Sequence, residues 1–176
     1  MIYKGSVKQK DIYIGSTKIG KVYKGSTLEY QSKLPAGIIL FESGTPGTYT
    51  INVEANCTIR LDMCGAGGNS TLNHPYNGGQ GGYIYGETEL EKGTYTIIVG
   101  APNGGASSFN GNIAYGGGNA GRHSGGVGGG CTVVSDGLIG SDGGTSSASR
   151  ILSYGGGGWY RDRQDGQPGY CKIITV

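Results

Sequence analysis

Residues 115–134 read YGGGNAGRHSGGVGGGCTVV, and this stretch contains the two features that decide the fold. Runs of glycine at 116–118 and 128–130 alternate with polar residues and lead directly into 131–134, a β-branched segment typical of strands. Glycine makes up 39 of the 176 residues, and 32 of these glycines lie between Gly65 and Gly169. Ordering a glycine costs about 0.5–1 kcal/mol more than ordering an alanine. A folded protein therefore keeps such runs only where a side chain would not fit.

A high glycine content without a strict repeat is typical of linkers and disordered segments. The segments between the glycine runs argue against that interpretation, because they alternate apolar with polar residues or are rich in β-branched and aromatic residues. They lie at 38–41, 48–53, 57–63, 83–85, 94–99, 131–134 and 171–176. No capping box precedes a run with helical periodicity, so no helix of useful length is expected. We predict a mainly β fold.

The glycine runs are long enough for about one turn of a polyproline-II-type helix, which has three residues per turn and no internal hydrogen bonds. Buried backbone groups must find partners, so such segments must bond to neighbouring segments. Two backbones approach closely enough only where the residues between them lack a Cβ atom. We therefore expect short polyglycine-II-like segments packed above the strands.

The first 33 residues contain a repeat with a period of ten, in which a tyrosine precedes a Gly-Ser turn. Its repeated positions are Tyr3, Gly5, Tyr13, Gly15, Tyr23 and Gly25. Isolated two-stranded hairpins are marginal in water, so this repeat is expected to gain stability from copies of itself or from a larger assembly. We predict an attachment segment at 1–33 and a glycine-rich β domain at 38–176. Seven lysines against Asp11 and Glu29 give residues 1–33 a net charge of +5, and the remainder carries −3.

Several classes of site lack their motifs. The four cysteines form no CxxC pair and no histidine stands at zinc-finger spacing, so neither a metal nor a cofactor is expected. An even number of cysteines also allows disulfides. The absence of a secretory signal favours free thiols in a protein made in the cytoplasm. The longest apolar run, at 38–41, is too short to cross a bilayer.

The motifs of nucleotide-binding proteins, enzymes and RNA-binding proteins are also incomplete. Residues 65–71 follow a predicted strand as a phosphate loop would, but they lack the lysine and the following helix that such loops need. No signature brings serine, histidine and aspartate together, and Asp136, Asp142, Asp162 and Asp165 are typical of turns in polar loops. No Arg-Gly-Gly repeat is present, and the glycine-rich part is net negative. We expect neither an enzyme nor a nucleic-acid-binding protein.

One polar loop combines the residue types that are enriched at binding hot spots. It contains Trp159, Tyr160, Arg161, Asp162 and Arg163, including the only tryptophan of the chain. Aromatic faces stack on sugars or side chains, and arginines and carboxylates hydrogen-bond hydroxyl groups. The alternative is that Trp159 packs under its own loop as a local core. The loops at 69–77, with His74 and Tyr76, and at 119–124, with Arg122 and His123, are weaker candidates for the same binding surface.

The order of the motifs over residues 38–176 resembles the glycine-rich domain of phage tail-fibre and adhesin-like virion proteins. The matching stretches are FESG at 41–44, GTYTI at 47–51, CGAGG at 64–68, GGQGGY at 78–83, GTYTIIVG at 93–100, SSFNG at 107–111, GGGG at 155–158 and PGYCKII at 168–174. The N-terminal repeat Ile-Tyr-x-Gly-Ser is similar to segments of structural proteins from phages of gut bacteria. Adhesins of this type pack their glycine runs as polyglycine-II helices.

This resemblance implies a structural protein of the virion, made in the host cytoplasm and displayed on a tail or head fibre. It implies that the N-terminal repeats contact other virion proteins, that the chain forms a homo-oligomer, and that the glycine-rich domain contacts a glycan or protein on the host surface. No insertion into a membrane is expected. The alternative is a purely structural fibre or capsid-decoration protein that binds no ligand.

Overall fold

The computed structural model describes residues 33–71, 76–144, 155–157 and 165–176, together with the backbone of four strands in the N-terminal segment. All regular secondary structure in these described residues is β, which confirms the predicted fold class. In the N-terminal segment, β1 (Ile12–Ile14) pairs with β2 (Thr17–Ile19), and β3 (Lys21–Lys24) pairs with β4 (Thr27–Gln31). These two antiparallel hairpins join neither of the larger sheets.

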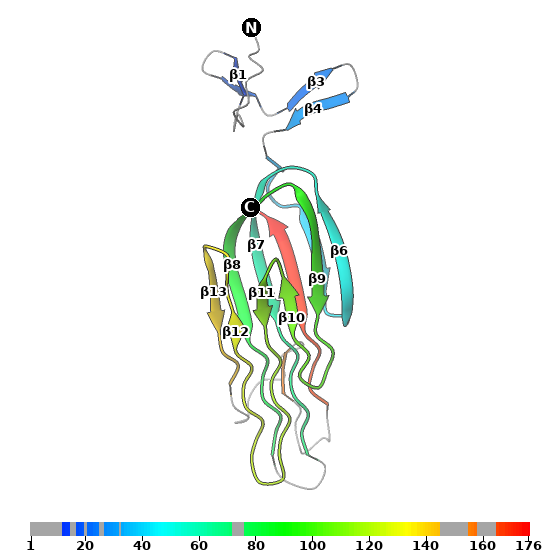
Figure 1. Ribbon diagram of the computed structural model, residues 1–176, viewed down its shortest axis with the longest axis vertical. Coiled ribbons are helices and arrows are strands. Elements are labelled where there is room, and N and C mark those ends of the chain that lie inside the picture. The colour runs from blue at the N-terminus through cyan, green and yellow to red at the C-terminus, as the bar shows by residue number, and fades with distance from the viewer. Residues whose placement is uncertain are drawn as a thin grey trace.

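Two antiparallel sheets of five strands make up the rest of the fold (Figure 1). The first sheet has the order β12-β11-β10-β9-β6, formed by Cys131–Thr132, Asn112–Ala114, Ser107–Phe109, Gly93–Val99 and Gly47–Val53. The second sheet has the order β13-β8-β7-β14-β5, formed by Leu138–Ser141, Tyr83–Leu90, Cys57–Cys64, Tyr170–Thr175 and Ile39–Ser43. Strand β14 therefore lies between strands that come more than a hundred residues earlier in the chain.

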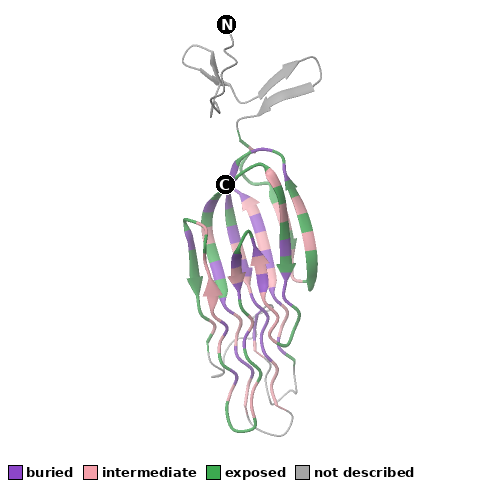
Figure 2. Ribbon diagram, viewed as in Figure 1, coloured by how far each residue is buried: buried purple, intermediate pink, exposed green. Residues whose placement is uncertain are grey.

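The hydrophobic core lies between the two sheets and follows from the alternation of residues along each strand. In β7, Ile59, Leu61 and Met63 are fully buried, and the residues between them point outward. The facing sheet contributes Ile97 and Phe109, both almost completely buried. Figure 2 shows this alternation as bands of buried and exposed residues along the strands. The alternation of apolar and polar residues along each strand in the sequence thus indicates which side chains face the core.

Asn112 is the best-connected buried polar side chain of the sandwich. Its amide nitrogen donates to the Phe109 carbonyl at 3.1 Å and to the Ser135 hydroxyl at 2.9 Å. Its Oδ1 accepts from the backbone N–H of Val134 at 2.9 Å. Buried polar groups need such partners, so Asn112 fixes the β10–β11 hairpin to the segment that follows β12.

Glycine-rich segments continue from one end of the sandwich and pack side by side as a bundle, here called the glycine bundle (Figure 1). Its longest segments among the described residues are 65–71, 76–82, 115–121 and 124–130. In the first, every third N–H donates to the second: Gly65 to Gly82 O, Gly68 to Gly79 O and Thr71 to Tyr76 O. Bonds to the same neighbour at every third residue are the signature of a helix with three residues per turn.

The same period recurs between the other segments. Segment 115–121 donates at every third residue to segment 124–130, and segment 124–130 donates from Gly126 and Gly129 to Asn77 O and Gln80 O. Segment 76–82 lies at the centre, because its consecutive donors Gly79, Gln80 and Gly81 reach three different neighbours, at Gly118, Gly144 and Gly155. Polyglycine-II-like segments were predicted from the sequence, and their bonding pattern is present.

Backbone approaches in the bundle leave no room for side chains. A Cβ atom on Gly117 would overlap the carbonyl of Gly79, and one on Gly81 would overlap the carbonyl of Gly65. In both cases the obstacle is main chain, which cannot move aside as a flexible side chain can. This close contact explains why the glycines are tolerated despite their entropic cost.

The two ends of the domain have different roles in the architecture. At one end, the N–H of Leu34 donates to Asn56 O and the N–H of Gly37 donates to Thr175 O, so the segment that enters the domain lies beside its C-terminal strand. The glycine bundle extends from the opposite end (Figure 1). Among the described residues, no helix is long and apolar enough to cross a membrane.

Three strands were not predicted from the sequence: β10, β11 and β13. The predicted strand at 131–134 pairs only through β12. The cysteines are free thiols, with Cys57 and Cys171 buried and Cys64 and Cys131 half-buried, as the free-thiol interpretation expects. The domain boundaries predicted at 33 and 38 stay predictions.

Candidate functional site: the tip of the glycine bundle

The three loops proposed from the sequence as a binding surface have their described anchors at the same place, the end of the glycine bundle farthest from the sheets. The N–H of Thr71 bonds to Tyr76 O at 3.4 Å and forms the last connection between the first two segments. The N–H of Gly121 bonds to Ser124 O at 2.8 Å and closes the turn between the next two. We call this end the tip.

Asn69 connects all three loops. Its carbonyl accepts from the N–H of Ala120 at 2.9 Å, and its own N–H donates to Asn119 Oδ1 at 2.8 Å. Its side-chain Oδ1 accepts from the N–H of Gly166 at 2.9 Å, across 97 positions of sequence. A single residue of the first loop therefore holds the second loop through its backbone and the third through its side chain.

The residues that flank 158–164 are packed against the first two segments. A Cβ on Gly157 would overlap the Gly78 carbonyl, and one on Gly166 would overlap the Gly67 carbonyl. The N–H of Gln167 also donates to Gly156 O at 2.8 Å. The described residues on both sides of 158–164 thus belong to the bundle, next to the other two loops.

The sequence-predicted site residues fall into two groups. Arg122 and His123 lie exposed in the turn at the tip, and Tyr76 is half-buried at the start of segment 76–82. Trp159, Tyr160, Arg161, Asp162, Arg163 and His74 lie outside the described residues, as do Tyr3, Gly5, Gly15 and Gly25. Tyr13 belongs to β1 and Tyr23 to β3, both within the predicted attachment segment.

Sequence reasoning missed the structural role of Asn69 and Asn119. A signal for both exists, because each ends an identical Gly-Gly-Asn triplet, at 67–69 and at 117–119. At these two positions the closely packed glycines end. From there the side-chain oxygens of Asn69 and Asn119 accept hydrogen bonds from backbone N–H groups of neighbouring segments. The repeated triplet marks where the bundle changes into loops.

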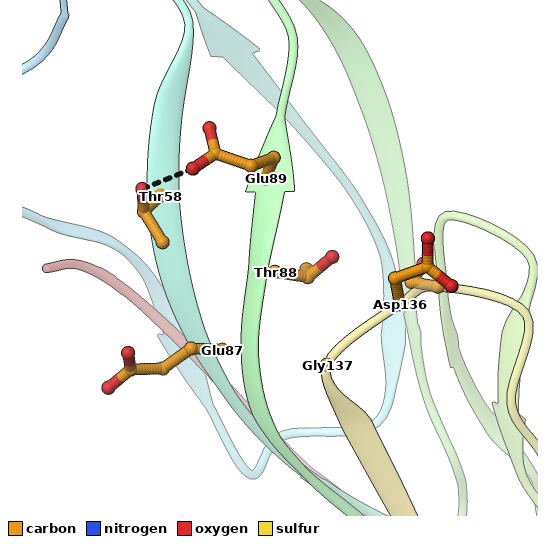
Figure 3. A pocket seen from close by; sticks show the side chains of 7 residues that line it. Thr58, Glu87, Thr88, Glu89, Asp136 and Gly137 are labelled. Carbon is orange, nitrogen blue, oxygen red and sulfur yellow. Dashed lines mark hydrogen bonds between the residues drawn. The ribbon is translucent and has the colours of Figure 1, made fainter.

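A separate depression lies on the sandwich, with a cavity volume of about 510 Å³. It is lined by Thr58, Glu87, Thr88, Glu89, Ser135, Asp136 and Gly137. Figure 3 shows the carboxylates of Glu87 and Glu89 on the opposite side of β8 from Asp136. Glu89 accepts from the Thr58 hydroxyl at 2.7 Å, and Glu87 pairs with Arg60 at 2.8 Å. Two carboxylates that face one another, as glycoside hydrolysis requires, are not found in this depression.

The other carboxylates considered from the sequence are scattered. Asp136 lines the depression, whereas Asp165 lies beside Gly166 at the tip. Among the described residues, no group of three histidine, cysteine, aspartate or glutamate side chains is placed to hold a metal ion.

Burial raises the pKa of the thiols near the base of the bundle. The pKa of Cys171 rises to about 12 and that of Cys64 to about 11, in both cases mainly because burial penalises the thiolate. The neutral thiol is a weak nucleophile, so both cysteines act as packing residues at neutral pH.

No protein-family model matches the chain, and no curated protein matches it closely.

Proposed function

We propose that this protein is a phage virion protein whose glycine-rich domain attaches to a bacterial surface through its tip. The N-terminal repeats hold the chain on the particle, and the tip contacts a glycan or protein of the host. The domain carries no chemistry in this proposal, and its task is adhesion.

One observation carries the proposal: three loops that are remote in sequence have their anchors joined by Asn69 at the tip of a closely packed bundle. The bundle extends about 20 Å for a segment of seven residues at 3.1 Å per residue. It also lies opposite the end at which the attachment segment enters. Binding loops on a rigid support, held away from the point of attachment, are what an adhesin requires.

The test measures binding to cells. Fluorescent beads coated with the full chain are incubated with a panel of intact gut bacteria and counted by flow cytometry, because many copies convert weak contacts into measurable avidity. Truncation of a hot-spot residue costs more than about 1 kcal/mol, so Trp159→Ala, Arg161→Ala and Arg122→Ala are each expected to reduce binding roughly 10-fold. Lys92→Ala, an exposed change between β8 and β9, is the control and is expected to bind normally.

Two outcomes would overturn the proposal. Binding that persists in all three variants would place the contact elsewhere on the domain. A complete lack of binding to the panel, by beads that carry correctly folded protein, would favour the alternative, a fibre or capsid-decoration protein without a ligand.

A further inference from the structure

The two sheets of the sandwich present very different outer faces. In the sheet that contains β6 and β9, the exposed positions are occupied mainly by Thr48, Thr50, Asn52, Thr94 and Thr96. Short polar side chains of this kind are typical of a solvated β surface. The outer face of the other sheet combines large apolar side chains with charges, and the strands β1–β4 are not part of it.

Apolar residues on this second face form a group across neighbouring strands. Tyr83 and Tyr85 of β8 are 37% and 40% exposed, and Ile139, paired with Tyr85, is 54% exposed. The rings of Tyr83 and Tyr85 stack with centroids 5.3 Å apart. Tyr170 lies beyond, on β14, because it and Tyr83 both pair with Cys64. Exposed aromatic groups of this kind are enriched where proteins bind one another.

The charges on the same face are unequal. Alternation along the strands places outward the carboxylates of Glu42, Asp62, Glu87 and Glu89 and the cations Arg60 and Lys172. Lys33, which precedes β5, adds a third cation 3.5 Å from Glu89. Arg60 is already paired with Glu87 at 2.8 Å, and Lys172 with Glu42 at 3.1 Å. The side chain of Asp62 accepts from the Tyr83 hydroxyl at 2.8 Å. With four carboxylates and three cations, these described residues give the aromatic surface a net charge of −1.

The N-terminal hairpins belong to a segment of the opposite net charge, and neither hairpin joins a larger sheet. They belong to residues 1–32, in which six lysines against Asp11 and Glu29 give a net charge of +4, and each forms a sheet of only two strands, which is marginal alone. Figure 1 places both hairpins beyond the end of the domain where the C-terminus lies. A basic segment and an acidic aromatic surface have complementary charges.

We propose that the outer face of the β13-β8-β7-β14-β5 sheet binds the basic N-terminal hairpins of a second copy of this chain. This inference rests on the attachment role proposed above for the N-terminal repeats. The contact joins two different surfaces, the hairpins of one copy and the sheet face of the next. Each copy carries both surfaces, so repetition of the contact produces a ring or an open filament. The tip stays outside the contact.

Zero-length cross-linking of lysines to carboxylates tests the proposal directly. The full chain is prepared in ¹⁴N and ¹⁵N forms, mixed, treated with a carbodiimide and analysed by mass spectrometry. Cross-links that join lysines of residues 1–24 in one isotope to Glu42, Asp62, Glu87 or Glu89 in the other are expected. Links confined to chains of one isotope would show that each arm covers its own face, and an absence of links to these carboxylates would remove the contact. Either result overturns the proposal.

A matched pair of substitutions tests the apolar part of the surface. Tyr85→Ser removes a 40% exposed ring from the proposed face, and Ile98→Ser removes a 41% exposed side chain from the other sheet. Sedimentation velocity is expected to show association weakened roughly 10-fold by Tyr85→Ser, in the range of an interface hot spot, and unchanged by Ile98→Ser. Thermal unfolding of both variants confirms that each is folded.

Salt and cell binding separate this proposal from the proposed function. Raising the salt from 0.05 to 0.5 M is expected to weaken association, because the attraction between opposite net charges is screened. Equal effects of the two substitutions, or association that strengthens with salt, would contradict the proposed contact. The beads display many copies whether or not the chain associates with itself, so cell binding by the tip can be measured even if the contact between copies does not exist. Conversely, association between copies can be measured by cross-linking and sedimentation even if the tip binds no cell.

Discussion

At the residue scale, the structure depends on the missing side chain of glycine. At Gly117, the N–H donates to Ala66 O while a Cβ would overlap the main chain of Gly79. Gly130 belongs to the neighbouring segment, yet its Cβ would meet only Asp142 Oδ1, at an ordinary distance of 3.6 Å. The same residue type is therefore obligatory at one position and replaceable at the other.

This contrast gives a prediction with its own control. Gly117→Ala is expected to destabilise the fold by about 2 kcal/mol or more, because the added methyl group overpacks rigid backbone. Gly130→Ala is expected to be neutral, or stabilising by up to about 1 kcal/mol, because alanine lowers the entropy of the unfolded chain. Chemical denaturation of both variants measures the difference, and equal stability would contradict the close packing at Gly117.

A second prediction at this scale concerns Glu42. The Tyr170 hydroxyl, 2.7 Å from Glu42 Oε1, lowers the pKa of the carboxyl below its ordinary value of 4.5, with a further contribution from Lys172. Tyr170→Phe is expected to raise the pKa of Glu42, which an NMR titration of the side-chain carboxyl measures. Tyr115→Phe, which removes a hydroxyl that bonds to Thr132, is the control.

The sign of the effect on stability follows from the same shift. A carboxyl whose pKa is lowered by folding stabilises the protein above its ordinary pKa, and this contribution is lost as the pH falls through the lower folded value. The Tyr170→Phe variant is therefore expected to be less stable than the parent at neutral pH, and this difference is expected to disappear as the pH falls well below 4.5 and the carboxyl is protonated. A difference in stability that persists unchanged in acid, where the Glu42 carboxyl is protonated, would mean that the hydroxyl acts through packing.

At the scale of elements, the sequence predicted the strands better than the bundle. Alternation identified β7, β9 and β14 because one face of each is buried, which repeats every second residue. The strands β10 and β11 were missed although Asn110-Gly111 between them is a typical hairpin turn, with both residues at positive φ. Their three-residue length left too little pattern to recognise, and Asn112 interrupts the apolar character with a buried amide.

The extent of the bundle was also not predictable from glycine runs alone. Non-glycine residues interrupt the runs and yet continue the same helices through their backbone hydrogen bonds. Val127 is 70% exposed while its carbonyl accepts from Gly118, and Gln80 donates to Gly144 O from its backbone. A period of three, rather than an unbroken run of glycine, decides which residues must lack a side chain. The convergence of the three loops depended on pairing between distant segments, which a single sequence does not reveal.

The prediction at this scale concerns the asparagine that joins the loops. Asn69→Ala removes the acceptor of the Gly166 N–H, so hydrogen exchange at Gly166 is expected to accelerate roughly 10-fold or more. Asn69→Asp retains an oxygen at the same position and is expected to preserve the protection. The N–H of Ala120 bonds to the backbone carbonyl of residue 69 and should be much less affected in both variants. Equal exchange at Gly166 in both variants would contradict this role of the side chain.

At the scale of the whole molecule, the decisive property is the rigidity of the glycine bundle. We predict slow amide exchange at Gly79, Gln80, Gly81 and Gly82, whose donors all bond to neighbouring segments. The protection at these central residues is expected to approach that of core strands such as β7. Amide exchange within seconds over segments 65–71 and 76–82 would show that the bundle is flexible. The proposal that the bundle holds the loops on a rigid support would then be wrong.

The position of β14 between β7 and β5 has a consequence for biosynthesis. A nascent chain that emerges from the ribosome cannot complete this sheet until residues 170–175 have been translated, and the same wait applies to Gly67, whose N–H bonds to Gln167 O. Polypeptides cut short by a premature stop codon would expose the unpaired edge of β7 and become substrates for proteolysis. Only chains translated through β14 would then complete the fold and escape proteolysis.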